Sequence, residues 1–330
     1  MTVSLVVGPA EHGVTAAALA QWGVVGTDPG RRLVRRVGRP DLPDVLQELD
    51  GAGPGPVLVH VTDRLFGRDA DEAAAFVEGL ASARDLLVTL HDLPQPSDGP
   101  VNHPRRARAY RRMAEAASAV VVSSRHEQRL LAACGVTRVA DVVPLPVPRF
   151  APSPAADPWA RPVAVAVLGF LYPGKGHELV LDALDGLPAG VGLSALGRPS
   201  DGHEDLVVEL TRRAHAKGRT FDVTGYVPDA ELPALLRSAV IPVAPHEHLS
   251  ASGSINAWIG AGRRPLVPRS DYVTELLERH PDCVRVYDDL ASALVEVWST
   301  PELSWADGPG GPTLEETVQE LLAIADRLPA

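Results

Sequence analysis

Residues 163–187 read VAVAVLGFLYPGKGHELVLDALDGL, and this stretch decides the fold. Its first eight residues form an apolar run of strand length, which is typical of a parallel strand buried on both faces. A Pro-Gly-Lys-Gly turn follows, and apolar residues then recur at helical spacing. A strand, a glycine turn and a helix N-terminus form a site for an anion, because free backbone N–H groups and the helix dipole point toward the ligand.

Lys175 adds a full positive charge to this turn. The chain has 31 lysines and arginines, but only Lys175 and Lys217 are lysines. Arginine is therefore the usual cation of this sequence, and a lysine at position 175 indicates a specific role beside an anion. The alternative is a solvated lysine in a turn that binds nothing.

Length and composition indicate a two-domain globular protein, because 330 residues exceed what one core usually serves. No apolar run is long enough to span a bilayer, and the start, MTVSLVVGPAEHG, lacks the basic region and cleavage site of a signal peptide. We therefore expect a cytoplasmic protein without membrane association. The two cysteines, Cys134 and Cys283, fit a reducing compartment and do not make a metal site.

The net charge of −11 argues against a nucleic-acid partner and leaves neutral, cationic and small phosphorylated ligands open. Homodimerisation is also left open.

Apolar runs alternate with helical patterns along the whole chain, which predicts an α/β protein with doubly wound parallel sheets. The proline- and alanine-rich residues 151–162 read as a linker between domain 1–150 and domain 163–330. Strand-like runs are expected at residues 2–8, 56–62, 85–93, 118–124, 140–147, 163–170, 191–197, 221–227, 239–245 and 263–268; helices are expected at residues 14–22, 69–83, 105–117, 126–134, 177–187 and 313–328.

Four blocks, in this order along the chain, resemble the retaining family 4 glycosyltransferases. They are TLHDLPQP at residues 89–96, ASAVVVSSRHEQRLLAACGV at 117–136, GFLYPGKGH at 169–177 and SAVIPVAPHEHLSASGSINAWIGAGRRPLVP at 238–268. The resemblance implies the GT-B architecture, with two Rossmann-like domains facing across a cleft and a last helix that packs back on the first domain. It also implies a nucleotide-diphosphate sugar as the donor and an enzyme of the hexosyltransferase type.

The last block departs from the family at its donor-binding motif. The family carries two glutamates separated by seven residues, with a glycine three positions after the first. Gly253 matches that glycine, which places Ser250 and Trp258 at the glutamate positions. Because the second glutamate usually holds the ribose hydroxyls, Asn256 and Glu247 are the candidates to replace the missing carboxylates.

The lysine block also lacks the family's usual arginine, because Phe170 follows Gly169. Arg198 is the candidate for a second cation at the diphosphate, and Gly174 lets the turn approach it. No separate cofactor is expected, because the nucleotide sugar is itself a substrate.

The serine segment, residues 250–254 (SASGS), directly precedes an apolar helical run. Ser250, Ser252 and Ser254 with Gly253 can form a nest of backbone donors for a phosphate at a helix start. The simpler alternative is an ordinary serine N-cap.

In the first half, Gly13 and His12 follow the first expected strand, and His91 and Asp92 lie at the carboxyl end of the strand expected at residues 85–93. Open α/β sheets bind ligands at the carboxyl ends of their strands. The family histidine that matches His91 touches the donor sugar, so we assign His91 as a catalytic candidate. Lys175 is the second catalytic candidate, because its charge lies where the diphosphate is expected. Gly13 is assigned to the donor, and His12 and Asp92 to the acceptor. A structural histidine at 91 and a plain helix-start glycine at 13 are the alternatives.

Two other patterns are given structural interpretations. Asp69-Ala70-Asp71 opens an alanine-rich stretch, where acidic residues stabilise a helix N-terminus, so no metal is expected. The arginines of residues 103–117 surround a helix without an apolar face, which favours a solvated helix over a membrane surface or an acidic acceptor.

The sequence therefore predicts a metal-independent glycosyltransferase that moves a sugar from a nucleotide diphosphate to a small acceptor with retention. Catalysis would come from positioning and from stabilisation of the leaving diphosphate. Two alternatives remain: a relative with other nucleotide-sugar chemistry, such as an epimerase or a pseudo-glycosidic coupling enzyme, and a non-catalytic nucleotide-sugar-binding protein.

Overall fold

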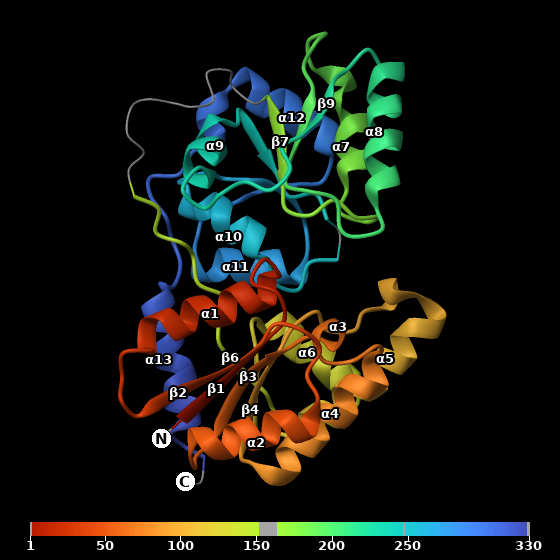
Figure 1. Cartoon of the computed structure of the whole chain (residues 1–330). Helices are drawn as coiled ribbons and strands as arrows, with labels where there is room; N and C mark the ends of the chain where they lie inside the picture. Colours follow the sequence, from red (N-terminus) through yellow and green to blue (C-terminus); the bar gives the residue numbers. More distant parts are fainter. Residues whose placement is uncertain (1, 152–163, 247, 329–330) are drawn as a thin grey trace. The chain divides into compact units, whose positions relative to one another are not determined.

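The structure, a computed structural model, describes residues 2–151, 164–246 and 248–328. The chain divides into two compact units, Met1–Pro146 with Pro312–Ala330, and Val147–Gly311. Each unit has its own parallel sheet and its own hydrophobic cores (Figure 1). The predicted linker at residues 151–162 lies outside the described residues, apart from Ala151.

The first unit is built on a parallel sheet with the strand order β2-β1-β3-β4-β5-β6. Its strands are β1 (Thr2–Val7), β2 (Arg31–Arg36), β3 (Val57–Val61), β4 (Leu86–Leu90), β5 (Ala119–Val122) and β6 (Asp141–Val142). Its helices are α1 (Gly13–Val25), α2 (Leu42–Ala52), α3 (Asp63–Phe66), α4 (Ala70–Ala83), α5 (Gly99–Ala116), α6 (Arg125–Ala133) and α13 (Leu314–Ala325). Helices α2, α4 and α5 pack on one face of the sheet, and α1 and α13 lie side by side on the other.

The second unit has a parallel sheet with the strand order β12-β11-β10-β7-β8-β9. Its strands are β7 (Val165–Leu168), β8 (Leu193–Leu196), β9 (Phe221–Val223), β10 (Ile241–Val243), β11 (Leu266–Pro268) and β12 (Arg285–Tyr287). Its helices are α7 (His177–Ala183), α8 (Glu204–Ala216), α9 (Leu232–Ser238), α10 (Gly253–Gly260), α11 (Asp271–Arg279) and α12 (Leu290–Ser299). Helices α7, α8 and α12 cover one face, while α9 and α10 pack on the other.

Each sheet has a point where the chain reverses its direction of travel across the sheet. In the first unit this point lies between β1 and β3, and in the second it lies between β7 and β10. Ligands of open α/β sheets bind outside the carboxyl ends of the strands at such points. The topology therefore places the loops after β1, β7 and β10 where a ligand is expected.

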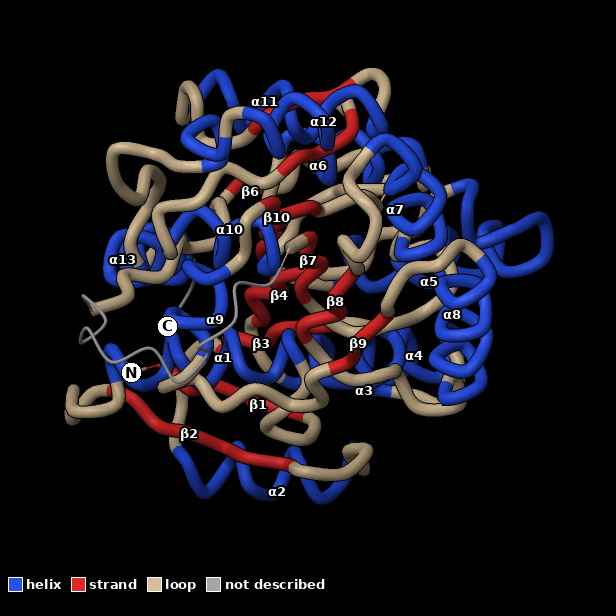
Figure 2. The backbone as a smooth tube through the Cα atoms, turned by 90° about the horizontal axis from the view of Figure 1, so that it is seen from above, coloured by secondary structure: helices blue, strands red, loops and turns tan. Residues whose placement is uncertain are grey.

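The predicted doubly wound parallel sheets are confirmed, but the sequence pattern did not predict two of the edge strands. The strand β2 reads RRLVRR and contains only two apolar residues, and β12 is three residues long. Both lie at the edge of a sheet, where one side of the strand is open and arginines are tolerated. Figure 2 shows β2 at the edge of the first sheet. Helix α5 also begins six residues before the expected start and continues through Pro104.

The docking of α13 on the first sheet gives a stability prediction. Leu321 is buried in a core with Leu87 and Val121 of that sheet, so Leu321→Ala should lower the free energy of unfolding by about 2–4 kcal/mol. The matched control is Leu179→Ala on α7, where the side chain is 46% exposed and the expected loss is below about 1 kcal/mol. Urea unfolding of both variants measures the difference, and equal losses would show that α13 contributes no core.

Candidate functional site

Lys175 lies in the loop that joins β7 to α7, which we call the lysine loop (residues 169–176). Gly174 and Gly176 take left-handed conformations, with φ of 88° and 93°, and a side chain on Gly176 would clash with Pro245 after β10. The turn is thereby pressed against the neighbouring strand end. A Cβ on Gly169 would lie only 3.4 Å from the Lys175 Nζ, so the lysine side chain returns over the start of its own loop.

The serine segment (residues 250–254) follows β10 and starts α10. The Ser252 hydroxyl accepts a hydrogen bond from the backbone N–H of Ile255 at 3.2 Å, so this segment contains the ordinary serine N-cap that was the simpler alternative to a phosphate nest. The same hydroxyl lies 3.0 Å from the Ser254 hydroxyl, and Lys175 Nζ donates to Ser254 Oγ at 3.4 Å. The lysine loop and the serine segment therefore meet at the switch point of the second sheet.

Lys175 is a buried cation with no carboxylate beside it among the described residues. Its side chain is only 6% exposed, and burial lowers its pKa to about 8. A buried ammonium group costs free energy unless a counter-charge approaches it. The arrangement therefore favours an anion that enters from outside the protein, next to the first N–H groups of α10.

Two histidines that the sequence interpretation missed complete this cluster. His246 follows β10 and its Nε2 lies 3.4 Å from Ser252 Oγ, while His177 begins α7. Burial and the charge of Lys175 lower the pKa of His177 to about 3, and the same causes lower the pKa of His246. Both imidazoles are thus neutral, and Lys175 is the only positive charge that the described residues contribute to the cluster. The position of His246 after an expected strand was the signal available in the sequence.

In the first unit, His12, His91 and Asp92 come together after β1 and β4. Burial lowers the pKa of His91, the charge of Asp92 opposes this shift, and His12 reinforces it. His12 is the N-cap of α1, and its Nδ1 accepts a hydrogen bond from the backbone N–H of Val14 at 3.3 Å. The structure thus brings the three predicted residues of this unit to one sheet edge.

A rigid frame holds the backbone at this point. Asp92 adopts a left-handed conformation with φ of 52°, which is uncommon for a residue with a side chain. The Tyr110 hydroxyl donates to the carbonyl oxygen of His91 at 2.8 Å, and Arg106 donates to that of Asp92 at 2.6 Å. Arg106 also forms an ion pair with Asp63 at 2.9 Å. This arginine of α5 is therefore part of the interior, whereas we expected it on a solvated helix.

The remaining residues that the sequence predicted for the site differ in their exposure and in their partners. Arg198 lies over the ring of Phe170 and pairs with Asp201 at the surface. Ser250 and Asn256 are buried and have polar partners, whereas Glu247 lies outside the described residues. A Cβ on either Gly13 or Gly253, the first residues of α1 and α10, would meet no atom within 4 Å. Neither glycine has a positive φ, so the fold itself does not require them.

Among the described residues, no group of three or more histidine, cysteine, aspartate or glutamate side chains is arranged to hold a metal ion. The described helices also include none with the length and apolar character needed to cross a bilayer.

The sequence matches no model of a protein family and no curated protein. Its fold is shared with several solved structures. Anabaena HepE in complex with UDP and glucose is 14% identical, with a TM-score of 0.77 and 99% of each chain covered. AviGT4, a glycosyltransferase involved in avilamycin A biosynthesis, is 18% identical, with a TM-score of 0.59 over 99% of this chain and 95% of that one.

An alpha-glucosyltransferase in complex with UDP and DNA is 10% identical, with a TM-score of 0.64 and 99% of each chain covered. The chain has the GT-B fold. Its two six-stranded parallel sheets with flanking helices match those of these glycosyltransferases, which confirms the predicted fold class.

Burial of Lys175 in this GT-B chain predicts a stability gain when the charge is removed. Lys175→Met should raise the free energy of unfolding at pH 7 by about 1–3 kcal/mol, because the folded state no longer holds a buried ammonium group. The control is Lys217→Met at the chain's other lysine, which pairs with Asp185 at the surface at 3.1 Å; it should lose less than about 1 kcal/mol.

The free energy of unfolding should also depend on pH, because the pKa of Lys175 differs between the folded and the unfolded state. The Lys175 pKa is about 8 when folded and 10.5 when unfolded, so the folded state releases its proton first as the pH rises. Stability of the wild type should therefore increase relative to Lys175→Met between pH 8 and 10.5. Denaturant unfolding of both proteins across this range measures the difference, and a constant gap would show that Lys175 is not a buried charge.

Proposed function

We propose that the protein is a glycosyltransferase that moves a sugar from a nucleotide-diphosphate donor to a small-molecule acceptor, in the manner of family 4 enzymes. The observation that carries the proposal is Lys175, a buried ammonium group without a described carboxylate partner at the start of α10 and the switch point of the second sheet. A diphosphate supplies the missing negative charge and accepts hydrogen bonds from the helix start. Solved structures of the same fold that contain UDP, UDP-glucose or UDP with glucose support this assignment.

The proposed role of Lys175 is to stabilise the leaving diphosphate. Negative charge builds up on the diphosphate as its bond to the anomeric carbon breaks, and a preorganised cation in a water-poor site stabilises that charge most in the transition state. Ser254 and the backbone N–H groups at the start of α10 bind the same oxygens. The acceptor hydroxyl then attacks the anomeric carbon, and its proton passes to a diphosphate oxygen.

The finer assignments belong to the same proposal. Attack from the face that the diphosphate leaves gives retention of configuration and requires no protein nucleophile. His91 contacts a hexose-type sugar, His12 and Asp92 contact the acceptor, and Gly13 and Gly253 leave room for the ligand. The reaction takes place in the cytoplasm and needs no metal.

A non-catalytic nucleotide-sugar-binding protein is the second candidate, because Ser250 and Trp258 stand where the family carries glutamates. Calorimetry with a panel of nucleoside diphosphates, starting with UDP, identifies the ligand. Donor hydrolysis and transfer to small hydroxyl acceptors are then followed by mass spectrometry, and NMR of the product reports the anomeric configuration. Binding without turnover would favour the second candidate, and no binding would overturn both.

Lys175→Met should weaken diphosphate binding by roughly 10- to 100-fold while leaving the affinity for the free nucleoside unchanged, because the lost contact is charge-assisted and made to phosphate. The affinity of the wild type should also fall as the pH rises through about 8, where the free Lys175 loses its proton, whereas the variant should show no such fall. Isothermal titration at pH 7, 8 and 9 tests both statements. Equal losses for diphosphate and nucleoside would remove Lys175 from the phosphate site.

We also expect full activity in the presence of a chelator. The aspartate-x-aspartate sequence is a helix start, because Asp69 accepts a hydrogen bond from the N–H of Glu72 at 3.0 Å and Asp71 pairs with Arg112 at 3.4 Å. Initial rates with EDTA, and with added manganese or magnesium, measure the dependence. Loss of activity with EDTA and its rescue by either metal would contradict the expectation.

A further inference from the structure

A chain of hydrogen bonds runs behind His91 into the interior of the first unit. His91 Nε2 lies 2.9 Å from His60 Nδ1, and His60 Nε2 lies 2.8 Å from Gln21 Oε1. Gln21 is on α1 and His60 on β3, while His91 follows β4. The sheet register pairs His60 with Thr89, so the side chain of residue 91 returns to the same face as His60.

Both imidazoles of this chain are held neutral. They are buried, and burial lowers the pKa of His60 to about 3 and also lowers that of His91. A neutral imidazole has one nitrogen that donates and one that accepts. A proton on one nitrogen of His60 therefore decides which nitrogen of His91 carries its own proton.

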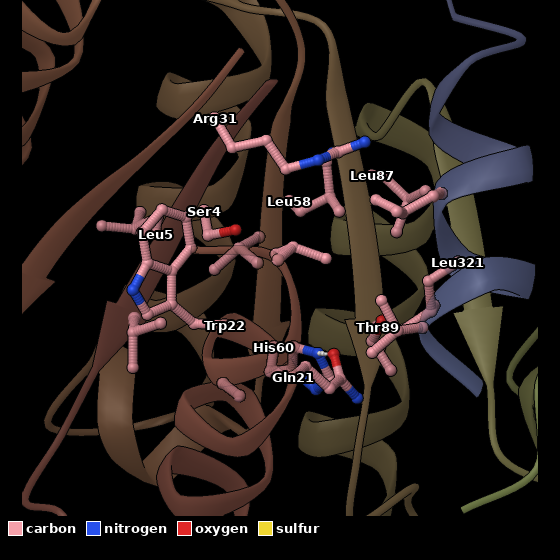
Figure 3. A pocket seen from close by; sticks show the side chains of 16 residues that line it. Ser4, Leu5, Gln21, Trp22, Arg31, Leu58, His60, Leu87, Thr89 and Leu321 are labelled. Atoms are coloured by element: carbon pink, nitrogen blue, oxygen red, sulfur yellow. Dashed lines mark hydrogen bonds between the residues drawn. The ribbon is translucent and has the colours of Figure 1, made fainter. Parts of the chain in front are cut away.

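Gln21 sets the direction of the whole chain. Its amide oxygen faces His60, so His60 Nε2 is the donor and His60 Nδ1 is the acceptor. His91 then donates from Nε2, which leaves Nδ1 as a bare acceptor with no hydrogen-bond partner among the described residues. Gln21 and His60 border a small cavity of about 30 Å³ between the sheet and helices α1 and α13, which is large enough for one water molecule (Figure 3).

We propose that Gln21 and His60 are positioning residues that present His91 Nδ1 as a hydrogen-bond acceptor for a hydroxyl group of the sugar. The ligand part of this inference rests on the proposed glycosyltransferase function. An acceptor nitrogen binds a hydroxyl, which can donate, and opposes a carboxylate, which only accepts. The chain therefore selects a neutral hexose over a uronic acid at the sugar position that His91 touches.

The frame around His91 supports a positioning role. Tyr110 and Arg106 fix the backbone at residues 91 and 92, and the rings of His60 and His91 are nearly parallel, at 17° with centroids 5.1 Å apart. The charged or titratable groups next to His91 are His60, His12 and Asp92, and Arg64 lies beside His12. His91 is thus fixed both in position and in the nitrogen that it offers.

The decisive test is the position of the proton. Long-range nitrogen–proton NMR spectra of the full chain labelled with ¹⁵N-histidine show which ring nitrogen is protonated, and His60→Gln and His91→Gln assign the signals. We expect Nε2–H on both histidines in the wild type, and a mixture of tautomers at His91 in Gln21→Met. Gln128→Met is the matched control, because Gln128 donates to the carbonyl of Ala140 at 2.7 Å elsewhere in the same unit; it should leave His91 unchanged. A proton on His91 Nδ1 in the wild type, or no change in Gln21→Met, would overturn the role of Gln21 and His60.

A kinetic test addresses the ligand. Gln21→Met should lower kcat/KM for a neutral hexose donor about tenfold, with the affinity for the nucleoside diphosphate unchanged. The ratio of kcat/KM for this donor to kcat/KM for the matching uronic acid donor should therefore be smaller in the variant than in the wild type. Gln128→Met should retain the wild-type preference. A wild type that favours the uronic acid would overturn the hydroxyl assignment. If no sugar transfer is found at all, the proposed function fails, while the NMR spectra still decide whether Gln21 and His60 orient His91.

Discussion

The charge of buried Lys175, which has no carboxylate partner among the residues that the structure describes, is the constraint on which the site of the second unit depends. The loop around it is shaped for that charge: Gly169 leaves space for the amine, the glycines beside Lys175 turn the chain back, and Ser254 accepts from Nζ. The neighbouring histidines are neutral and do not compete for an anion. A fold that retains such a charge gives up stability in the free state, which is a common feature of binding sites.

Sheet topology explains why the polar clusters are found where they are. Parallel strands end at one edge, and the switch points between β1 and β3 and between β7 and β10 open that edge to ligands. The two units differ in the chemistry that they place there. The second offers a cation and helix N–H groups, which suit a phosphate, whereas the first offers imidazoles kept neutral by burial, which suit hydroxyl groups.

Patterns of buried strands and glycine turns were sufficient to predict five of the six strands of each sheet and the loop that contains Lys175, because these features are local in sequence. Three kinds of feature were not local. The edge strand β2 lacks the apolar pattern, since half of its surroundings is solvent. The helical pattern around Arg106 predicted a solvated side chain, because the sequence does not show that the fold places Asp63 beside it. The pairing of His60 with Gln21 and His91 depends on strand register and on the packing of α1, which no single segment encodes.

Trp258 shows how the donor motif departs physically from the family pattern. Its ring is fully buried with Ala166, Leu196 and Leu235, and its indole N–H has no hydrogen-bond partner in the described part of the chain. A carboxylate at this position would be a charge in an apolar core, at a cost of several kcal/mol. In this chain the position therefore serves packing. Under the proposed function, ribose recognition falls to other residues, and the candidate Asn256 is buried one turn after Ser252 on the same side of α10.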